Sequence, residues 1–275
     1  MLLILCAHRP EATPIIKHYD LSLYSGRSTF PVYLGDDGRI ALTISGTGKV
    51  AAAAACMNLA HMAGSGTTDA WLNAGIAGHG TCEPGVAMLA HKIIDVATGR
   101  TWFPQIHFPA GMPSADCYTV DAPVNTREQA LYDMEASGFL DTVTRLATLE
   151  HIHAVKVVSD NSDRPYQEVT PGFAGELIEA AMPAIAKVAD QLIESSNTLA
   201  ETRRPHPAMN GFLLRRHFTE SQRHQLSRLL SRWHCLYPDI DPLHQFANRK
   251  NARQVLDALR KALDESPVHI GVKTE

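Results

Sequence analysis

Two carboxylates and a glycine-rich run stand directly after stretches of the chain that are expected to be strands. Glu11 comes shortly after the apolar opening of the chain, and Asp160 comes after the β-branched stretch 154–158. Between them, Gly75–Gly78 follows the strand-like stretch 70–74. Ligands of an α/β sheet bind at the carboxyl ends of its strands, so we expect these segments to border one site. Carboxyl groups there can donate or accept a proton during a reaction.

The run Ser45-Gly-Thr-Gly-Lys49 could be taken for a phosphate-binding loop. Its spacing fits neither the Walker A motif nor the dinucleotide fingerprint, which needs three glycines at G-x-G-x-x-G. We interpret the run as a tight turn between a strand and a helix, where glycine lets two backbones approach closely.

Histidine and cysteine are the other residue types that could carry chemistry. His151 and His153 alternate before a strand, which places both on one face, but no carboxylate or third histidine is evidently joined to them. We expect packed or surface histidines and no metal. The five cysteines are scattered without a C-x-x-C pair, which argues against a disulfide framework and a cysteine zinc site and favours a reducing cytoplasm.

Strand-like and helix-like stretches alternate through the first 200 residues, and this alternation predicts an α/β fold with a largely parallel sheet. The segments are a set of apolar strands interleaved with helices: strands at 2–6, 39–44, 70–74, 85–94 and 154–158, and helices at 50–61 and 176–196. The glycines of 75–78 are expected to form a loop after their strand.

The charge distribution marks a boundary near residue 200. Residues 1–200 hold 12 Lys/Arg and 21 Asp/Glu, whereas residues 201–275 hold 13 and 8, within a net charge of −4. We predict a catalytic domain at 1–200 and a basic, mostly helical extension at 201–275. The segment 201–213 has the composition of a linker.

Two helices are predicted inside the extension. Thr219-Glu-Ser-Gln222 has capping-box spacing ahead of a helix that Tyr237-Pro238 ends, and 251–263 is a second helix. We expect the arginines of the extension to form a solvent-exposed helical face. The alternative is that they bind an acidic partner or nucleic acid, with nucleic acid the less favoured of the two. Since 45% of residues are apolar, 20% are charged and no long apolar run occurs, we expect no membrane association.

Five motifs in order resemble the nucleoside phosphorylase/nucleosidase superfamily, most closely the bacterial 5′-methylthioadenosine/S-adenosylhomocysteine nucleosidases. The motifs are a loop ending in a glutamate, S-G-x-G-K-x, N-x-G-x-A-G, M-E-A and S-D, found here as Cys6–Glu11, Ser45–Val50, Asn73–Gly78, Met134–Ala136 and Ser159–Asp160. The resemblance covers residues 1 to about 197. It implies a purine nucleoside phosphorylase-like three-layer sandwich around a mixed, largely parallel sheet, and a homodimer without cofactor.

The resemblance also implies a role for each matching residue. Glu135 binds the ribose hydroxyls, with Met134 packed on the sugar. Asp160 is the general acid that protonates N7 of the purine, and Ser159 orients it. Glu11 holds and activates the attacking water. These roles suit N-glycosidic cleavage, because the base should not depart as an anion from a cation-like sugar.

A looser part of the resemblance concerns the base. Ala77 and Gly78 line the base and sugar. Ala115–Tyr118 resembles a G-D-x-F segment whose aromatic residue stacks on the base, so Tyr118 stacks and Thr119 lends backbone groups to the base edge. A core tyrosine remains the alternative for Tyr118.

The departures from the family pattern leave the 5′ group and the nucleophile open. Arg9 and Pro10 replace acidic residues, and Ile76 replaces a small polar one. A phosphorylase of this superfamily has an arginine in the middle glycine segment, and Asn73–Gly78 has none. We therefore expect hydrolysis of a 5′-modified adenosine: methylthioadenosine, S-adenosylhomocysteine or 5′-deoxyadenosine. The alternatives are a phosphate-dependent phosphorylase and a non-catalytic partner-binding protein.

Overall fold

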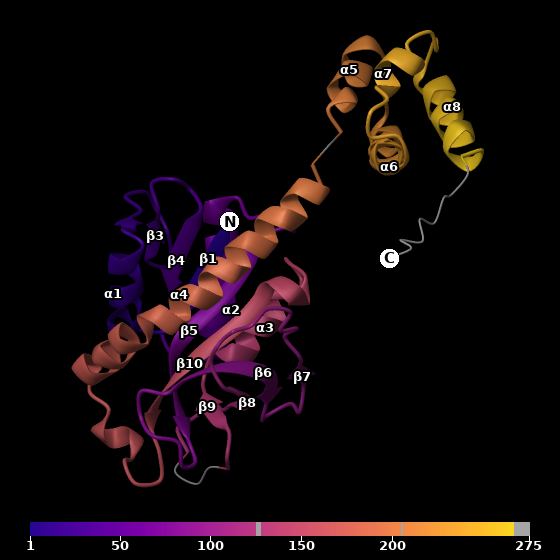
Figure 1. Ribbon diagram of the computed structural model, residues 1–275. Helices are drawn as coiled ribbons and strands as arrows, with labels where there is room; N and C mark the ends of the chain where they lie inside the picture. The colour runs from indigo at the N-terminus through magenta and orange to yellow at the C-terminus, as the bar shows by residue number, and fades with distance from the viewer. Residues whose placement is uncertain (125–127, 205, 267–275) are drawn as a thin grey trace. The chain divides into compact units, whose positions relative to one another are not determined.

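The computed structural model describes residues 1–124, 128–204 and 206–266, and the chain divides into two compact units. Unit 1 is Met1–Thr202 and unit 2 is Arg203–Glu275. Figure 1 shows the sheet in unit 1 and a group of helices in unit 2. Among the described residues, no helix combines the length and apolar character needed to cross a membrane.

Four parallel strands form the centre of unit 1, in the order β10–β5–β1–β4. They are β1 (Leu2–Cys6), β4 (Ile40–Ile44), β5 (Ala70–His79) and β10 (Ile152–Asp160). Every residue of β1 and β10 is buried. A strand covered on both faces reads as a continuous apolar run, which is why the sequence identified β1 so readily.

The strands outside this centre pair mostly antiparallel, so the sheet is mixed, as expected: among the described strands five pairings are parallel and five are antiparallel, and the parallel ones are the longer. The remaining strands are β2 (Ser22–Leu23), β3 (Val32–Leu34), β6 (Ala87–Asp95), β7 (Thr101–Trp102), β8 (Ser114–Thr119) and β9 (Leu131–Asp133). Both β9 and β10 pair with β5, and β8 and β6 connect them, so these strands close into a ring. Short connections such as that from β6 to β7 allow antiparallel pairing of consecutive strands, whereas parallel neighbours need a longer crossover.

Helices cover both faces of the sheet, as the alternation of side chains along β1 requires. Leu2, Ile4 and Cys6 pack in one apolar cluster with α1 (Arg9–His18) and α4 (Pro171–Thr202). Leu3 and Leu5 pack in the other with α2 (Lys49–Ala63) and α3 (Ala136–Val143). The 3-10 turns Leu149–His151 and Tyr166–Glu168 flank β10.

The glycines of Gly75–Gly78 lie in a strand and not in the loop that the sequence predicted. β5 continues to His79, because β10 pairs with it as far as Gly78. Ser159 and Asp160 are likewise the last residues of β10, with an irregular register between Val158 and Asp160. Because β5 and β10 extend further than predicted, strand backbone, and not a loop, forms this end of the sheet.

Unit 2 has an apolar core of its own, which includes Leu226, Leu230 and Trp233. Its helices are α5 (Ala208–Arg215), α6 (Glu220–Leu236), α7 (Pro242–Gln245) and α8 (Ala252–Asp264). The predicted capping box at Thr219 is confirmed, because the Gln222 N–H donates to its hydroxyl. The predicted linker 201–213 is wrong in extent, since α4 continues to Thr202 and α5 occupies much of the remainder.

Candidate active site

A cavity of about 310 Å³ opens at the carboxyl ends of the parallel strands in unit 1. This volume is at the lower end of the range for small-molecule sites. Most of the site residues predicted from sequence lie in its wall: Glu11, Ala77, Gly78, Met134, Glu135, Ser159 and Asp160. The structure therefore brings together residues that are up to about 150 positions apart in the chain, from the ends of β1, β5, β9 and β10.

Glu11 lies in the first turn of α1 and is 3% exposed. Its Oε2 accepts the backbone N–H groups of Ala7 and His8, at 3.1 and 3.2 Å. Burial raises the pKa of Glu11, and the nearby Lys156 opposes that rise. A Cβ at Gly75 would lie 3.2 Å from the same Oε2, so the glycine leaves room for the carboxylate beside β5. Glu11 is thus a fixed carboxylate that faces the cavity with little access to bulk water.

Glu135 is the residue directly before α3 and is 7% exposed. The backbone N–H of Gly48 donates to its Oε1 at 2.8 Å, which ties the turn before α2 to the start of α3. Burial, with the neighbouring Asp133, raises the pKa of Glu135 to about 7. The glycine turn of 45–49 therefore holds a carboxylate in place, a task that the sequence did not predict for it.

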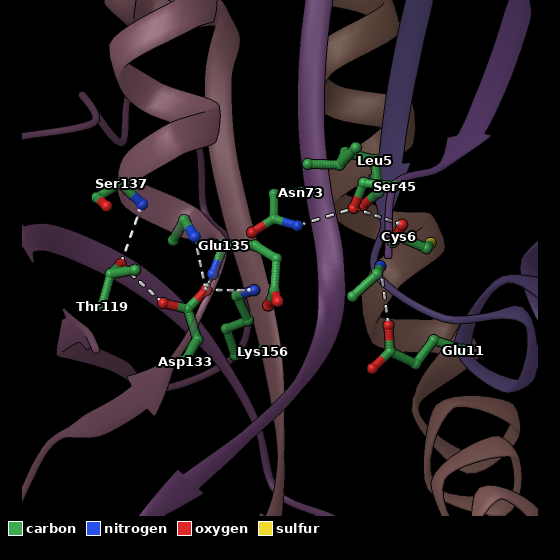
Figure 2. Close-up of polar contacts among 12 residues, drawn as sticks. Leu5, Cys6, Glu11, Ser45, Asn73, Thr119, Asp133, Glu135, Ser137 and Lys156 are labelled. Atoms are coloured by element: carbon green, nitrogen blue, oxygen red, sulfur yellow. Dashed lines mark hydrogen bonds and ion pairs between the residues drawn. The ribbon is translucent and has the colours of Figure 1, made fainter. Parts of the chain in front are cut away.

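Lys156 and Asp133 form a buried ion pair at the wall of the cavity, which Asp133 lines. Lys156 Nζ lies 2.8 Å from Asp133 Oδ2, and the two side chains are 1% and 0% exposed. Although burial disfavours its charged form, Asp133 and Glu135 raise the pKa of Lys156, so it is a permanent cation. Figure 2 shows its ammonium group against Asp133, with Glu135 beside it.

Asp133 also links this pair to a hydrogen-bonded chain. Thr119 Oγ1 donates to Asp133 Oδ1 at 2.8 Å (Figure 2), and the N–H of Ala136 donates to Oδ2 at 2.8 Å. The N–H of Ser137 donates to Thr119 Oγ1 in turn. The carboxylate therefore fixes the first turn of α3, on which the position of Glu135 depends.

Asp160 and its neighbour Ser159 end β10, and both are buried. Ser159 Oγ lies 2.5 Å from Asp160 Oδ1 and 3.2 Å from the carbonyl oxygen of Ala77. The serine hydroxyl can thus orient the carboxyl group by donating to one of its oxygens. An acid held in this way can direct its other oxygen at a ligand.

Tyr118 and Thr119 are the two predicted site residues that the structure does not bring to this cavity. Tyr118 borders a separate surface hollow with His91 and Asp116. Its ring stacks on Tyr132, with centroids 5.4 Å apart, and Tyr132 lines the active-site cavity. Thr119 is fully buried in the hydrogen-bonded chain described above. Neighbouring residues of a strand point to opposite faces, so a match made by sequence order alone does not settle which side chain reaches a ligand.

A hydrogen-bonded pair at another part of the cavity wall joins two loops. His8 Nε2 and Thr47 Oγ1 are 3.0 Å apart, from the loop after β1 and the turn after β4. Sequence reasoning missed both residues. Among the described residues that line the cavity, His8 is the sole side chain that can carry a positive charge. Arg9 turns elsewhere and donates to the hydroxyl of Tyr33.

His151 and His153 lie away from the cavity and are buried, which agrees with packed histidines. His151 Nε2 is 2.8 Å from Ser195 Oγ, and the His153 ring packs on Phe108, with centroids 5.2 Å apart. Burial and the nearby His107 lower the pKa of His153 to about 4. No metal-binding cluster of three His, Cys, Asp or Glu side chains occurs within the described residues.

The comparisons with known proteins give matches among solved structures alone. No family description matches the sequence, and no curated protein sequence does. A futalosine hydrolase and a 5′-methylthioadenosine/S-adenosylhomocysteine nucleosidase, both of Helicobacter pylori, each share 14% identity with the chain at a TM-score of 0.55. Each match covers 69% of this chain and 97% of the other. A nucleosidase of S. pneumoniae matches at 17% identity and a TM-score of 0.55, over 70% and 98% of the two chains.

The chain has the nucleosidase fold. These solved structures are covered almost completely, whereas about 30% of this chain lies outside the match. The expected resemblance in fold is therefore confirmed at identities too low to transfer any residue's role.

Proposed function

We propose that unit 1 hydrolyses the N-glycosidic bond of a purine nucleoside and releases the free base. The observation that carries the proposal is the convergence of Glu11, Glu135 and Asp160 on one cavity from three separate segments. Solved structures of the same fold are named as nucleosidases that act on methylthioadenosine and S-adenosylhomocysteine and as a futalosine hydrolase, which supports a nucleoside substrate.

In this reaction Asp160 protonates N7 of the purine as the glycosidic bond breaks, so that the base leaves neutral. Ser159 holds the acid in position by its hydrogen bond to Oδ1. General acid catalysis of this kind contributes on the order of 10²–10⁴-fold in rate. Tyr132 and Tyr166, and not Tyr118, supply aromatic rings on the cavity wall.

The other two carboxylates act on the sugar. Glu135, held by the Gly48 N–H, accepts hydrogen bonds from the vicinal ribose hydroxyls, which its two oxygens suit. Glu11 orients and deprotonates a water molecule. Asp160 as the acid on the leaving base and Glu11 as the base on water follow the logic of inverting glycoside hydrolases.

Water is favoured over phosphate as the nucleophile because of the charge of the cavity wall. Its described residues include the carboxylates of Glu11, Asp133, Glu135 and Asp160 but no arginine or lysine, and the buried Lys156 is already paired with Asp133. A phosphate ion would meet four carboxylates, with His8 as the one described wall side chain that can carry a positive charge. We therefore favour hydrolysis over the phosphorylase alternative.

The test is base release by the purified full-length chain, with and without phosphate. The panel contains methylthioadenosine, S-adenosylhomocysteine, 5′-deoxyadenosine and adenosine, and the sugar product is analysed by mass. Release of adenine with a free sugar, independent of phosphate, supports the proposal. Strict phosphate dependence and a sugar 1-phosphate product would identify a phosphorylase, and no release from any nucleoside would favour the non-catalytic alternative.

A further inference from the structure

The His8–Thr47 pair lies at the opposite side of the cavity from Asp160. The strand order β10–β5–β1–β4 places Asp160 at the end of β10 and Thr47 just after β4. Adjacent strands are about 4.8 Å apart, so three intervals separate the two by roughly 14 Å. A nucleoside with its base at Asp160 therefore extends its sugar toward His8 and Thr47.

Glu135 and Glu11 mark where the sugar ring lies between these two limits. The Gly48 N–H holds Glu135, and Glu11 is anchored on Ala7 and His8, so both carboxylates are adjacent to the pair without being part of it. Glu135 is assigned to the ribose hydroxyls and Glu11 to the water. The group on C5′ is then the part of the substrate that remains to contact His8 and Thr47.

The pair has hydrogen-bonding capacity to spare. A neutral imidazole nitrogen either donates to the threonine oxygen or accepts its proton, and a threonine hydroxyl has one donor and two acceptor positions. With the 3.0 Å contact made, Thr47 can still donate in the first case and accept in the second. A hydroxyl group can meet either arrangement. A thioether sulfur accepts weakly and donates nothing, and a methyl group does neither.

We propose that His8 and Thr47 form a polar subsite for the group on C5′, so that the enzyme prefers a nucleoside with an oxygen there over one with hydrogen or an alkylthio group. The inference rests on the proposed nucleosidase function. Both side chains are exposed in the free protein, and a bound substrate displaces their water. An apolar 5′ group leaves the His8 and Thr47 side chains desolvated and without a hydrogen-bond partner, whereas a 5′ oxygen restores the hydrogen bond that the displaced water had made.

Adenosine and 5′-deoxyadenosine differ by this one oxygen and form the test pair. We expect kcat/KM for adenosine to exceed that for 5′-deoxyadenosine by about fivefold or more in the wild-type chain. Thr47→Val has nearly the same shape without the hydroxyl, and His8→Phe keeps a ring without its nitrogens. Each variant should bring the ratio toward one. Thr198→Val removes a hydroxyl that bonds the Glu194 carbonyl within α4, away from the cavity, and should leave the ratio at its wild-type value.

A third nucleoside separates the 5′ group from the sugar ring. Thr47→Val could instead change the kcat/KM ratio of adenosine to 3′-deoxyadenosine and leave that of adenosine to 5′-deoxyadenosine unchanged. In that case the pair binds the sugar ring and the proposal is wrong. Equal wild-type rates for adenosine and 5′-deoxyadenosine would overturn it without any variant. These outcomes all require adenine release, so they are distinct from failure of the proposed function, in which no nucleoside is cleaved.

Discussion

Lys156 Nζ lies 2.8 Å from Asp133 Oδ2, and this buried pair adjoins the cavity, which Asp133 lines. A buried ion pair gives little net stability, because desolvation offsets most of the attraction. Its effect here is on charge: Lys156 opposes the pKa rises of Glu11 and Glu135, whereas Asp133 adds to that of Glu135. Lys156 therefore lowers the pKa of Glu135 and Asp133 raises it.

This opposition predicts opposite shifts in the pH profile. Lys156→Met should raise the pKa of Glu135 above its value of about 7 and move the acid limb of kcat/KM to higher pH. Asp133→Asn should lower that pKa and move the limb to lower pH. Lys156→Arg keeps the charge and should stay near the wild-type profile. The measurement is kcat/KM against pH with one nucleoside.

A purely structural role for the pair predicts a different result. Removing either partner from a buried pair costs about 3–5 kcal/mol of stability. If both variants lost stability but kept the wild-type pH profile in their folded fraction, the electrostatic role would be wrong. Melting curves recorded beside the kinetics make that distinction.

Asp160→Asn should lower turnover by on the order of 10²-fold or more while substrate binding changes little. An amide can still donate to N7 but cannot transfer a proton, so the lost stabilisation belongs to the transition state. Ser159→Ala removes the hydroxyl beside Oδ1 and should give a smaller loss of turnover. The measurements are kcat and the equilibrium affinity for a nucleoside. A folded Asp160→Asn protein with near wild-type turnover would remove this residue from the mechanism.

Sequence predicted the strands and site residues best where a local pattern fixed the structure. The apolar run of β1 and the stretch 154–158 were enough to place Glu11 and Asp160 after strands. The capping box at Thr219 was predicted correctly for the same reason, because its hydrogen bonds involve only four consecutive residues.

The features that sequence missed depend on pairing between distant segments. β5 extends through Gly78 because β10 lies beside it, and no local property of Gly75–Gly78 reveals that partner. Lys156 did leave a signal, as a lone charge in a strand of apolar residues, but its meaning required Asp133 across the sheet. The His8–Thr47 contact joins residues 39 positions apart and could not be read from either motif.

Stability should fall as pH rises through the neutral range, and Glu135 should account for part of the fall. Its pKa is about 7 in the folded protein against an ordinary value of 4.5, so folding favours the protonated form. That contribution is complete below pH 4.5 and is lost as the pH passes 7. Glu135→Gln cannot ionise and should show a flatter dependence of melting temperature on pH between 5 and 8. An identical slope for the two proteins would show that another group is responsible.

Gly138→Ala should destabilise unit 1 by about 1–3 kcal/mol, although alanine is the better helix former. A Cβ at Gly138 would lie 2.1 Å from the backbone oxygen of Lys49, so α2 and α3 must move apart. Their separation would also strain the Gly48–Glu135 hydrogen bond. Gly172→Ala is the matched control in α4, where a Cβ meets nothing closer than Thr170 Oγ1 at 4.0 Å. Chemical denaturation of both variants should give a loss for the first and no loss for the second.

A chain that ends at Thr202 should fold and keep wild-type kcat/KM, because every residue in the proposed reaction and both cores of the sheet lie within unit 1. The cut must follow α4 to its end. Ser196 is buried and donates to the Thr68 carbonyl at 2.8 Å, so the last turns of that helix belong to the catalytic unit. A chain that ends at Lys187 also removes Val188, Ala189 and Leu192 from the core and should fail to fold. The two truncations are compared by circular dichroism and by adenine release. If the chain ending at Thr202 folds and binds a nucleoside but does not turn it over, unit 2 takes part in catalysis, and assigning the reaction to unit 1 alone is wrong.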